Sequence, residues 1–207
     1  MLNLYYCRLP EEEPAVPEGL LSAYREEKLK KQTNARARLQ SVNAELLLRR
    51  ALKDSGFPPN GPLDIGAGEF GKPFLRGGEC FFSLSHSACE LLCALGSREI
   101  GADIQVKTKA RPSLMMRCFS EAEQSYVFDA ADPDAAFTEI WVKKESLIKR
   151  IGRGLAIPLA SFCVFDGEIA PLIWHTTEGE YHLAVCSDLI ATEKPKLIEV
   201  KTSVLFP

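Results

Sequence analysis

The sequence has no long hydrophobic run, no paired-cysteine motif and little net charge. Its apolar stretches stay well short of the roughly 20 residues of a membrane-spanning helix. The segment MLNLYYCRLPEEEP lacks the basic and apolar regions of a signal peptide. Its seven cysteines are scattered without a CxxC spacing, which favours reduced thiols over a disulfide framework. We therefore expect a soluble, cytoplasmic protein.

Two further absences narrow the classes of function. The net charge of −3 indicates no general affinity for nucleic acid. A GxxxxGK[ST] phosphate-binding loop is also missing, which disfavours a magnesium-dependent phosphotransferase built around that loop. The chain has 207 residues, 46% of them hydrophobic and 26% charged, so it can bury a core as one large domain or two fused small ones.

The hydrophobic pattern predicts an α+β fold. Each half of the chain combines helices with several strands, which indicates two similar α/β lobes, 1–101 and 102–207, meeting near Gly101. The expected helices are 18–31, 35–55, 113–119, 120–130 and 134–151. The expected strands are 2–9, 80–86, 91–95, the segment around Asp103, 161–165, 170–175 and 181–186, with 60–78 as a loop.

The segment REIGADIQV carries the first candidate site residues. Side chains alternate between the two faces of a strand, so Gly101, Asp103 and Gln105 share one face. Asp103 and Gln105 are then about 6–7 Å apart along the strand. This spacing places two oxygen-bearing side chains side by side.

The segment WVKKESLIK (141–149) carries the second. Phe137, Ile140 and Ile148 follow helical spacing, and Glu145 falls inside their apolar stripe. A carboxylate that faces a core is unfavourable unless a cation meets it. We therefore predict that Asp103 and Glu145 are two halves of one site for a hard cation, the alternative being two solvated or salt-bridged acids.

Several fragments occur in an order that resembles a known family. They are GKPF (71–74), FSLSHS (82–87), IGADIQ (100–105), FSEAE (119–123), WVKKESLIK (141–149) and GEYHLAVCS (179–187). Together they resemble the 4'-phosphopantetheinyl transferase superfamily, most closely its surfactin-synthetase-activating type, over residues 25–187. The resemblance implies a pseudo-dimer of two α/β lobes with coenzyme A in the cleft between them. It also implies magnesium-dependent transfer of the 4'-phosphopantetheine arm to a serine of an apo acyl or peptidyl carrier protein, releasing 3',5'-ADP.

The resemblance assigns roles around the cation. It makes Asp103 and Glu145 the metal ligands, and Gln105 replaces a third carboxylate of the family pattern, which leaves the metal site less anionic. Lys149 is expected to contact the phosphate nearest the leaving group. Glu123 is expected beside the metal as the base that deprotonates the carrier serine. Ser120 and Glu123 also have capping-box spacing, so a purely structural role is an equal alternative, with Glu145 then the next candidate base.

The resemblance also assigns residues to coenzyme A. His86 is expected to donate a hydrogen bond to a phosphate, assisted by Ser85, and Arg25 and Lys28 to bind the 3'-phosphate. The full set is Arg25, Lys28, Ser41, Lys72, Ser85, His86 and Lys149. Without the resemblance, the basic run that begins at Arg25 is simply a solvated helix face.

The partner surface and the function each keep an alternative. Arg111 and Arg117 flank apolar residues that could receive an acidic carrier protein, or that could be core: Leu114, Met115, Met116 and Phe119. A monomer is expected, because two fused lobes supply the cleft internally. The alternative function is a non-catalytic regulatory protein that binds coenzyme A, suggested by the uncharged Gln105.

Overall fold

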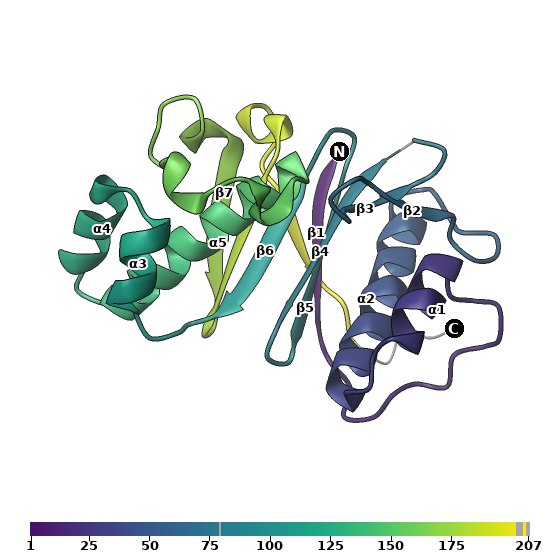
Figure 1. Cartoon of the computed structure of the whole chain (residues 1–207). Coiled ribbons are helices and arrows are strands. Elements are labelled where there is room, and N and C mark those ends of the chain that lie inside the picture. Colours follow the sequence, from purple (N-terminus) through teal and green to yellow (C-terminus); the bar gives the residue numbers. More distant parts are fainter. Residues whose placement is uncertain (79, 202–204, 206–207) are drawn as a thin grey trace.

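The computed structural model describes residues 1–78, 80–201 and 205. In these residues five α-helices and nine strands form a mixed α+β fold (Figure 1). The helices are α1 (Ala23–Lys30), α2 (Ala35–Asp54), α3 (Pro112–Cys118), α4 (Glu121–Phe128) and α5 (Pro133–Ile151). The strands are β1 (Leu2–Arg8), β2 (Ile65–Ala67), β3 (Pro73–Leu75), β4 (Phe81–Ser87), β5 (Glu90–Gly96), β6 (Gly101–Val106), β7 (Ile173–Glu178), β8 (Tyr181–Cys186) and β9 (Lys196–Glu199).

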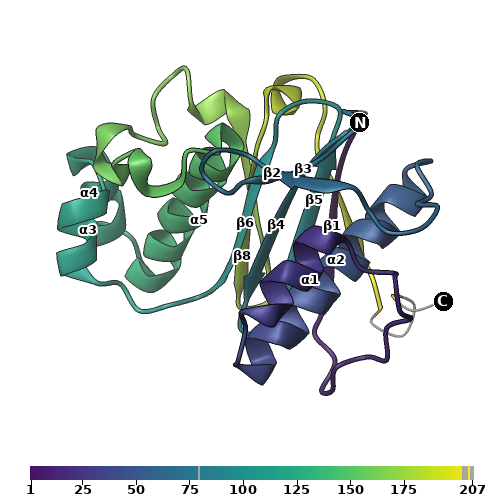
Figure 2. The same cartoon turned by 45° about the vertical axis from the view of Figure 1, so that its right-hand side comes forward.

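The strands form two larger sheets and one hairpin. The first sheet has the order β4-β5-β1-β9, the second the order β6-β8-β7, and β2 pairs with β3 alone. Helices α1 and α2 lie on one side of the central strands and α3, α4 and α5 on the other, as Figures 1 and 2 both show. The strand β9 pairs in parallel with β1, so the end of the chain returns to the first sheet.

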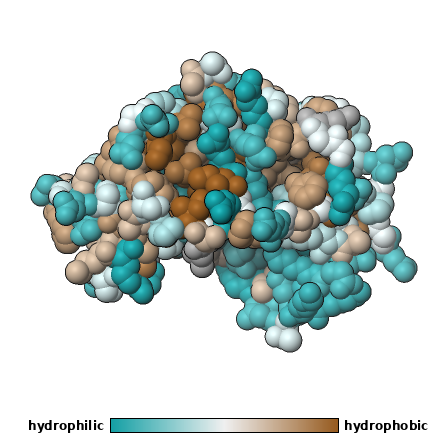
Figure 3. All heavy atoms as spheres, turned by 45° about the horizontal axis from the view of Figure 1, so that its top comes forward, coloured by the Kyte–Doolittle hydropathy of each residue, from teal (hydrophilic) through white to brown (hydrophobic). Residues whose placement is uncertain are grey.

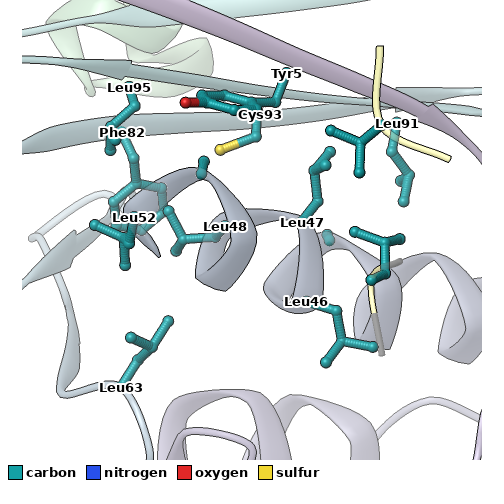
Figure 4. Packing of buried hydrophobic residues seen from close by; sticks show 14 of the residues in the cluster. Tyr5, Leu46, Leu47, Leu48, Leu52, Leu63, Phe82, Leu91, Cys93 and Leu95 are labelled. Atoms are coloured by element: carbon teal, nitrogen blue, oxygen red, sulfur yellow. The ribbon is translucent and has the colours of Figure 1, made fainter. Parts of the chain in front are cut away.

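Helix α2 covers the first sheet and forms its core. The helix begins after Asn34, whose side chain accepts a hydrogen bond from the Ala37 backbone N–H at 3.0 Å, a typical N-cap. Leu47 and Leu48 are fully buried and point toward the sheet residues Tyr5, Leu91 and Leu95 (Figure 4). This core fixes α2, and with it one wall of the groove described below.

Helix α5 lies directly on β6 because Gly101 has no side chain. A Cβ atom at Gly101 would lie 2.1 Å from the Ser146 carbonyl oxygen and 2.1 Å from the Arg150 nitrogen. The helix ends at Gly152, whose φ of 77° is the left-handed conformation that glycine adopts easily at a helix C-terminus. The close contact brings the last two turns of α5 against the strand that carries Asp103.

A row of serine hydroxyl groups joins the two larger sheets. One edge of β6 pairs with β8, and its other edge faces β4. There the hydroxyl groups of alternate serines of β4 accept hydrogen bonds from backbone N–H groups of β6. The three pairs are Ser83 with Ala102 at 3.0 Å, Ser85 with Ile104 at 3.4 Å and Ser87 with Val106 at 3.0 Å. We call this row the serine seam.

The structure corrects some predicted elements. Helix α1 begins at Ala23 and not at residue 18, because Ser22 caps it by accepting from the Arg25 N–H. The expected loop at 60–78 contains the β2–β3 hairpin, and β9 was not predicted. The strand expected at 161–165 is wrong. This segment is a loop, and Phe162 and Val164 of the loop pack into the apolar cluster under α3 and α4. Their alternating apolar pattern therefore reflects this packing and not a strand.

Each of the seven cysteines carries a reduced thiol, with no disulfide among them. Their reduced state agrees with the expectation from their spacing. Among the described residues, no helix has the length and apolar character needed to cross a bilayer.

On the face seen when the top of Figure 1 tilts forward, hydrophobic side chains gather near the middle and hydrophilic ones surround them (Figure 3).

Candidate active site

Two adjoining cavities form a groove between α1, α2 and β4 on one side and α5 on the other. The first, about 290 Å³, is lined by Arg25, Lys28, Ser41, Ser85 and His86. The second, also about 290 Å³, is lined by Lys72, Phe82, Glu145 and Lys149. Both are bordered by Gly71, Pro73 and Leu84, so they are continuous. The groove therefore gathers residues from distant parts of the sequence.

The first cavity has two cations with different surroundings. The Arg25 Nε lies 3.2 Å from the buried Glu45 carboxylate, and its Nη1 donates to Ser41 Oγ at 3.0 Å. The Lys28 ammonium has no hydrogen bond or ion pair with any described residue, and partial burial and the charge of Arg25 lower its pKa. A fixed guanidinium beside an unpaired ammonium favours binding of an anion with more than one negative charge.

His86 lines this cavity at the end of β4. Partial burial and the ammonium charges of Lys149 and Lys28 lower the pKa of its ring, and Asp103 opposes them. The ring is therefore neutral at pH 7 and carries one N–H. A neutral imidazole beside two ammonium groups can donate that hydrogen to a phosphate oxygen.

A three-residue network joins Ser85 of the first cavity and Lys149 of the second to the buried Asp103. Ser85 Oγ donates to Asp103 Oδ1 at 2.7 Å, and the Lys149 ammonium donates to the same Asp103 oxygen at 2.6 Å. The Lys149 ammonium also donates to Ser85 Oγ at 2.8 Å. These bonds fix the Asp103 carboxylate, and they use one of its two oxygens.

Glu145 lies one helical turn before Lys149 and is left without a partner. Its carboxylate makes no hydrogen bond or ion pair with the described residues. Burial and the negative charge of Asp103 raise the pKa of Glu145, while Lys149 opposes them. Asp103 and Glu145 are therefore close enough to repel each other.

The donor set fits magnesium better than a cation that needs a closed protein cage. No group of three His, Cys, Asp or Glu side chains suited to a metal occurs in the described residues. Magnesium is commonly bound by one or two carboxylates, with water and phosphate oxygens completing its coordination. Gln105 lies two residues beyond Asp103 on β6 and pairs in register with His182 of β8. Its amide oxygen adds a neutral donor on the Asp103 side of the strand.

Lys72 lies at the groove, but its ammonium is engaged. It donates to Glu99 Oε2 at 2.8 Å, to the Arg150 carbonyl at 2.8 Å and to the Ile100 carbonyl at 3.2 Å. The predicted contact of Lys72 with the nucleotide stays a prediction. The bonds of Lys72, however, tie the β2–β3 hairpin to the end of α5, and that role had no signal in the sequence.

Glu123 forms the capping box that its spacing predicted, which confirms the structural alternative. Ser120 Oγ accepts from the Glu123 N–H, and the Glu123 carboxylate accepts from the Ser120 N–H at 2.7 Å. The same carboxylate is fully buried, 2.8 Å from the Lys144 ammonium, and accepts from the Val164 N–H at 2.8 Å. With both oxygens engaged and shielded from solvent, Glu123 is poorly placed to accept a proton from a substrate.

Comparison with known proteins identifies the family. The family described as the 4'-phosphopantetheinyl transferase superfamily matches residues 99–193. A 4'-phosphopantetheinyl transferase of Bacillus subtilis is 32% identical over 185 residues, which cover 81% of this chain and 82% of that protein. The chain belongs to the 4'-phosphopantetheinyl transferase superfamily.

Other members of the superfamily give the same result. The 4'-phosphopantetheinyl transferase Sfp of Bacillus subtilis strain 168 is 35% identical over 136 residues, covering 58% of this chain and 60% of that protein. The transferase gsp of Aneurinibacillus migulanus is 26% identical over 186 residues, covering 87% and 78%. The predicted resemblance is thereby confirmed, and this phosphopantetheinyl transferase family member is a transferase.

Sequence reasoning missed two features of the site in this family member. The carboxylate of Glu45 holds Arg25 in place, and α2 offered no sequence signal for it because the residue looks like any helix glutamate. The serine seam did leave a signal, since Ser83, Ser85 and Ser87 alternate along one strand. Polar residues at every second position of a buried strand indicate that their side chains, and not the strand's backbone, form the hydrogen bonds to the neighbouring strand.

Proposed function

We propose that the protein transfers the 4'-phosphopantetheine arm of coenzyme A to a serine of an apo acyl or peptidyl carrier protein. The proposed reaction depends on magnesium and releases 3',5'-ADP. The observation that carries the proposal is the continuity of the groove: its basic end, with Arg25, Lys28 and His86, leads to Glu145 and Lys149, and Lys149 is bonded to Asp103. Coenzyme A has a matching order of groups, a 3'-phosphate followed by a diphosphate.

The cations of the groove bind and orient the phosphates. Arg25, already fixed by Glu45 and Ser41, and the unpaired Lys28 take the 3'-phosphate. His86 donates its ring N–H to a phosphate, and binding of this anion raises the pKa of the ring toward its ordinary value. Lys149 neutralises charge on the phosphate that leaves with the nucleotide.

The transfer breaks the bond between the phosphorus that bears the pantetheine arm and the bridging oxygen of the diphosphate. The serine oxygen of the carrier forms the new bond to that phosphorus. Magnesium held by Asp103 and Glu145, with Gln105 beside them, would offset the charge on the diphosphate oxygens. In-line displacement of this kind depends mainly on positioning and on charge neutralisation.

We propose that Glu145 is the base that accepts the proton of the carrier serine. A carboxylate has two oxygens, so one can hold the metal while the other accepts the proton directly or through a metal-bound water, and no described residue donates a hydrogen bond to either. Glu123, the first candidate from the family resemblance, is no longer proposed as the base, because its carboxylate is held by Lys144 and two backbone N–H groups.

A mass-shift assay tests the proposed function. The protein is incubated with coenzyme A, magnesium and a panel of apo carrier proteins, and the carriers are weighed by mass spectrometry. We expect one phosphopantetheine added per carrier, and transfer reduced at least 10²-fold in Asp103→Ala and in Glu145→Ala. Full activity in either variant would contradict the metal assignment.

The alternative function is a regulatory protein that binds coenzyme A without transferring its arm. Gln105 is the observation that favours it, because a neutral amide holds a divalent cation less strongly than a carboxylate does. Such a protein would bind coenzyme A saturably and leave every carrier mass unchanged. In such a protein, Gln105→Glu would raise the affinity for magnesium without producing transfer to a carrier.

We also propose the architecture that the family resemblance implies. The two lobes are 1–101 and 102–207, a pseudo-dimer with the active site between them, and strand β9 returns from the second part of the chain to the first sheet. We propose a monomer, because both walls of the groove come from one chain. For the carrier surface we keep Met116, which is 75% exposed, between Arg111 and Arg117, whereas Met115 and Phe119 are core.

A further inference from the structure

Lys149 already occupies a cation position at the carboxylate site. Its ammonium lies 2.6 Å from Asp103 Oδ1 and 2.8 Å from Ser85 Oγ. The charge of this ammonium also acts on Glu145, where it partly offsets the rise in the pKa. One positive charge therefore partly balances two carboxylates, and the cluster as a whole keeps a net charge of about −1.

A divalent cation at the same carboxylates would meet this ammonium. Any ion bound by Asp103 and Glu145 lies within a few ångströms of a group bonded to the same Asp103 carboxylate. Asp103 is buried and Glu145 half-buried, so water screens the repulsion between the two cations only in part. Lys149 and the metal therefore compete for Asp103.

Lys149 has a second place to go. Its side chain is 29% exposed, borders the groove at Gly152 and Ile148, and bears a charge that lowers the pKa of His86 on the opposite wall. A lysine side chain has four flexible methylene groups, so the ammonium can swing from Asp103 to an anion in the groove. The diphosphate of coenzyme A would be such an anion.

Ser85 can keep Asp103 oriented during that movement. Its hydroxyl donates to Asp103 Oδ1 independently of Lys149, and the Ile104 N–H holds the same hydroxyl from the serine seam. The exchange then moves one flexible cation and leaves the carboxylate in place.

We propose that Lys149 is an exchangeable internal cation, which fills the carboxylate site until a divalent ion and a diphosphate arrive together. This inference rests on the proposed function, because it takes the diphosphate of coenzyme A as the new partner of Lys149. Its consequence is coupling: coenzyme A tightens metal binding by removing the competing ammonium, and the metal tightens coenzyme A binding by the same factor.

Direct measurement of Mn²⁺ binding tests the coupling without any turnover. Free Mn²⁺ is measured by electron paramagnetic resonance for the wild-type protein and for Lys149→Gln, each with and without saturating coenzyme A. For the wild type we expect binding on the order of tenfold tighter with coenzyme A. Lys149→Gln should bind Mn²⁺ more tightly than the wild type when coenzyme A is absent, and its gain on adding coenzyme A should shrink.

The matched control is Lys143→Gln. It removes the same charge from the same helix, but Lys143 pairs with Glu139 and lies outside the network of Ser85 and Asp103. Its Mn²⁺ binding should equal that of the wild type. Lys149→Met, which cannot donate any hydrogen bond, serves if Lys149→Gln folds poorly. Equal or weaker Mn²⁺ binding by folded Lys149 variants without coenzyme A would overturn the exchange.

The two proposals fail in different ways. If the wild type modifies a carrier but the Lys149 variants show unchanged Mn²⁺ binding, the exchange is wrong and the transferase function stands. If no carrier in a broad panel gains mass while Lys149→Gln still binds Mn²⁺ more tightly than the wild type without coenzyme A, the exchange stands and the regulatory alternative is favoured.

Discussion

The residue that the fold tolerates least well within the site is Glu145. Its carboxylate is half-buried beside the carboxylate of Asp103, and no described residue donates a hydrogen bond to it. A charge in this position opposes folding unless a cation is bound. Stability and function therefore place opposite demands on this side chain.

We predict that Glu145→Gln stabilises the metal-free protein while transfer is lost. Burial and Asp103 raise the pKa of Glu145 above its ordinary value of 4.5, so the folded state binds this proton more tightly than the unfolded state. The ionised carboxyl therefore lowers stability progressively as pH rises from about 4.5 through the raised pKa. In EDTA at pH 7.5, thermal unfolding of Glu145→Gln should occur about 1–3 °C above that of the wild type.

Two comparisons check the cause of this shift. The difference in Tm should shrink as pH falls toward about 4, where Glu145 is protonated in both states. The exposed Glu168→Gln, which removes the same charge from a loop, should leave Tm within error at both pH values. A Tm for Glu145→Gln below that of the wild type at pH 7.5 would contradict the proposed repulsion.

At this scale the sequence could predict which residues matter, but not which atoms bond. Strand alternation and helical spacing placed Asp103 and Glu145 on facing surfaces, and the structure brings their charges together. Nothing in the local pattern could reveal that Ser85 and Lys149 share one oxygen of Asp103, since these contacts span 18 and 46 residues. Such pairings depend on how the elements pack.

Among the elements, α4 depends on a buried ion pair at its N-terminus. Glu123 belongs both to the capping box of this helix and to the ion pair. The Lys144 ammonium contacts Glu123 at 2.8 Å and donates to the Leu159 and Phe162 carbonyl oxygens. It therefore ties α5 to α4 and to the segment after α5. Removing one charge of such a pair leaves the other buried without a counter-ion.

We predict that Glu123→Gln lowers the free energy of unfolding by about 3 kcal/mol, because Lys144 then keeps its charge in a site shielded from water and without a counter-ion. The folded variant should retain kcat within a few-fold. The double variant Glu123→Gln/Lys144→Met should regain part of the lost stability, measured by urea unfolding. A 10²-fold or larger fall in kcat with stability unchanged would restore Glu123 as the catalytic base.

The contact of α5 with β6 depends on a single glycine. We predict that Gly101→Ala lowers the free energy of unfolding by about 3 kcal/mol or more, because its Cβ would meet backbone atoms of Ser146 and Arg150 that cannot rotate away. Gly167→Ala is the control, since its Cβ would meet nothing within 4 Å. Comparable stability of the two variants in urea unfolding would show that α5 can lift from the strand without loss.

Long periodic elements were predictable and short ones were not. Helices α2 and α5 carry strong apolar stripes and helix caps, and their predicted bounds differ from the observed ones by about one residue. The strands β2 and β3 have three residues each, too few to display alternation. Strand β9 pairs with β1 across nearly the whole chain, a contact that local pattern cannot encode.

In the molecule as a whole, the first sheet and the second are joined through side chains. The serine seam links β4 to β6, and Lys72 links the β2–β3 hairpin to the end of α5. The stem of Lys72 also packs over Gly152, where a Cβ would lie 2.8 Å from Lys72 Cδ. Both links border the groove, so the relative placement of its walls depends on them.

We therefore predict that Lys72→Met destabilises the protein even without coenzyme A. Methionine keeps most of the stem but cannot donate to Glu99 or to the Ile100 and Arg150 carbonyl oxygens, so the free energy of unfolding should fall by about 1–3 kcal/mol. Lys53→Met, at the exposed end of α2, should have no effect. Calorimetric titration with coenzyme A separates the two roles of Lys72. If stability is unchanged and only the affinity for coenzyme A falls, the ammonium serves the nucleotide, as the family resemblance implied, and does not hold the walls of the groove together.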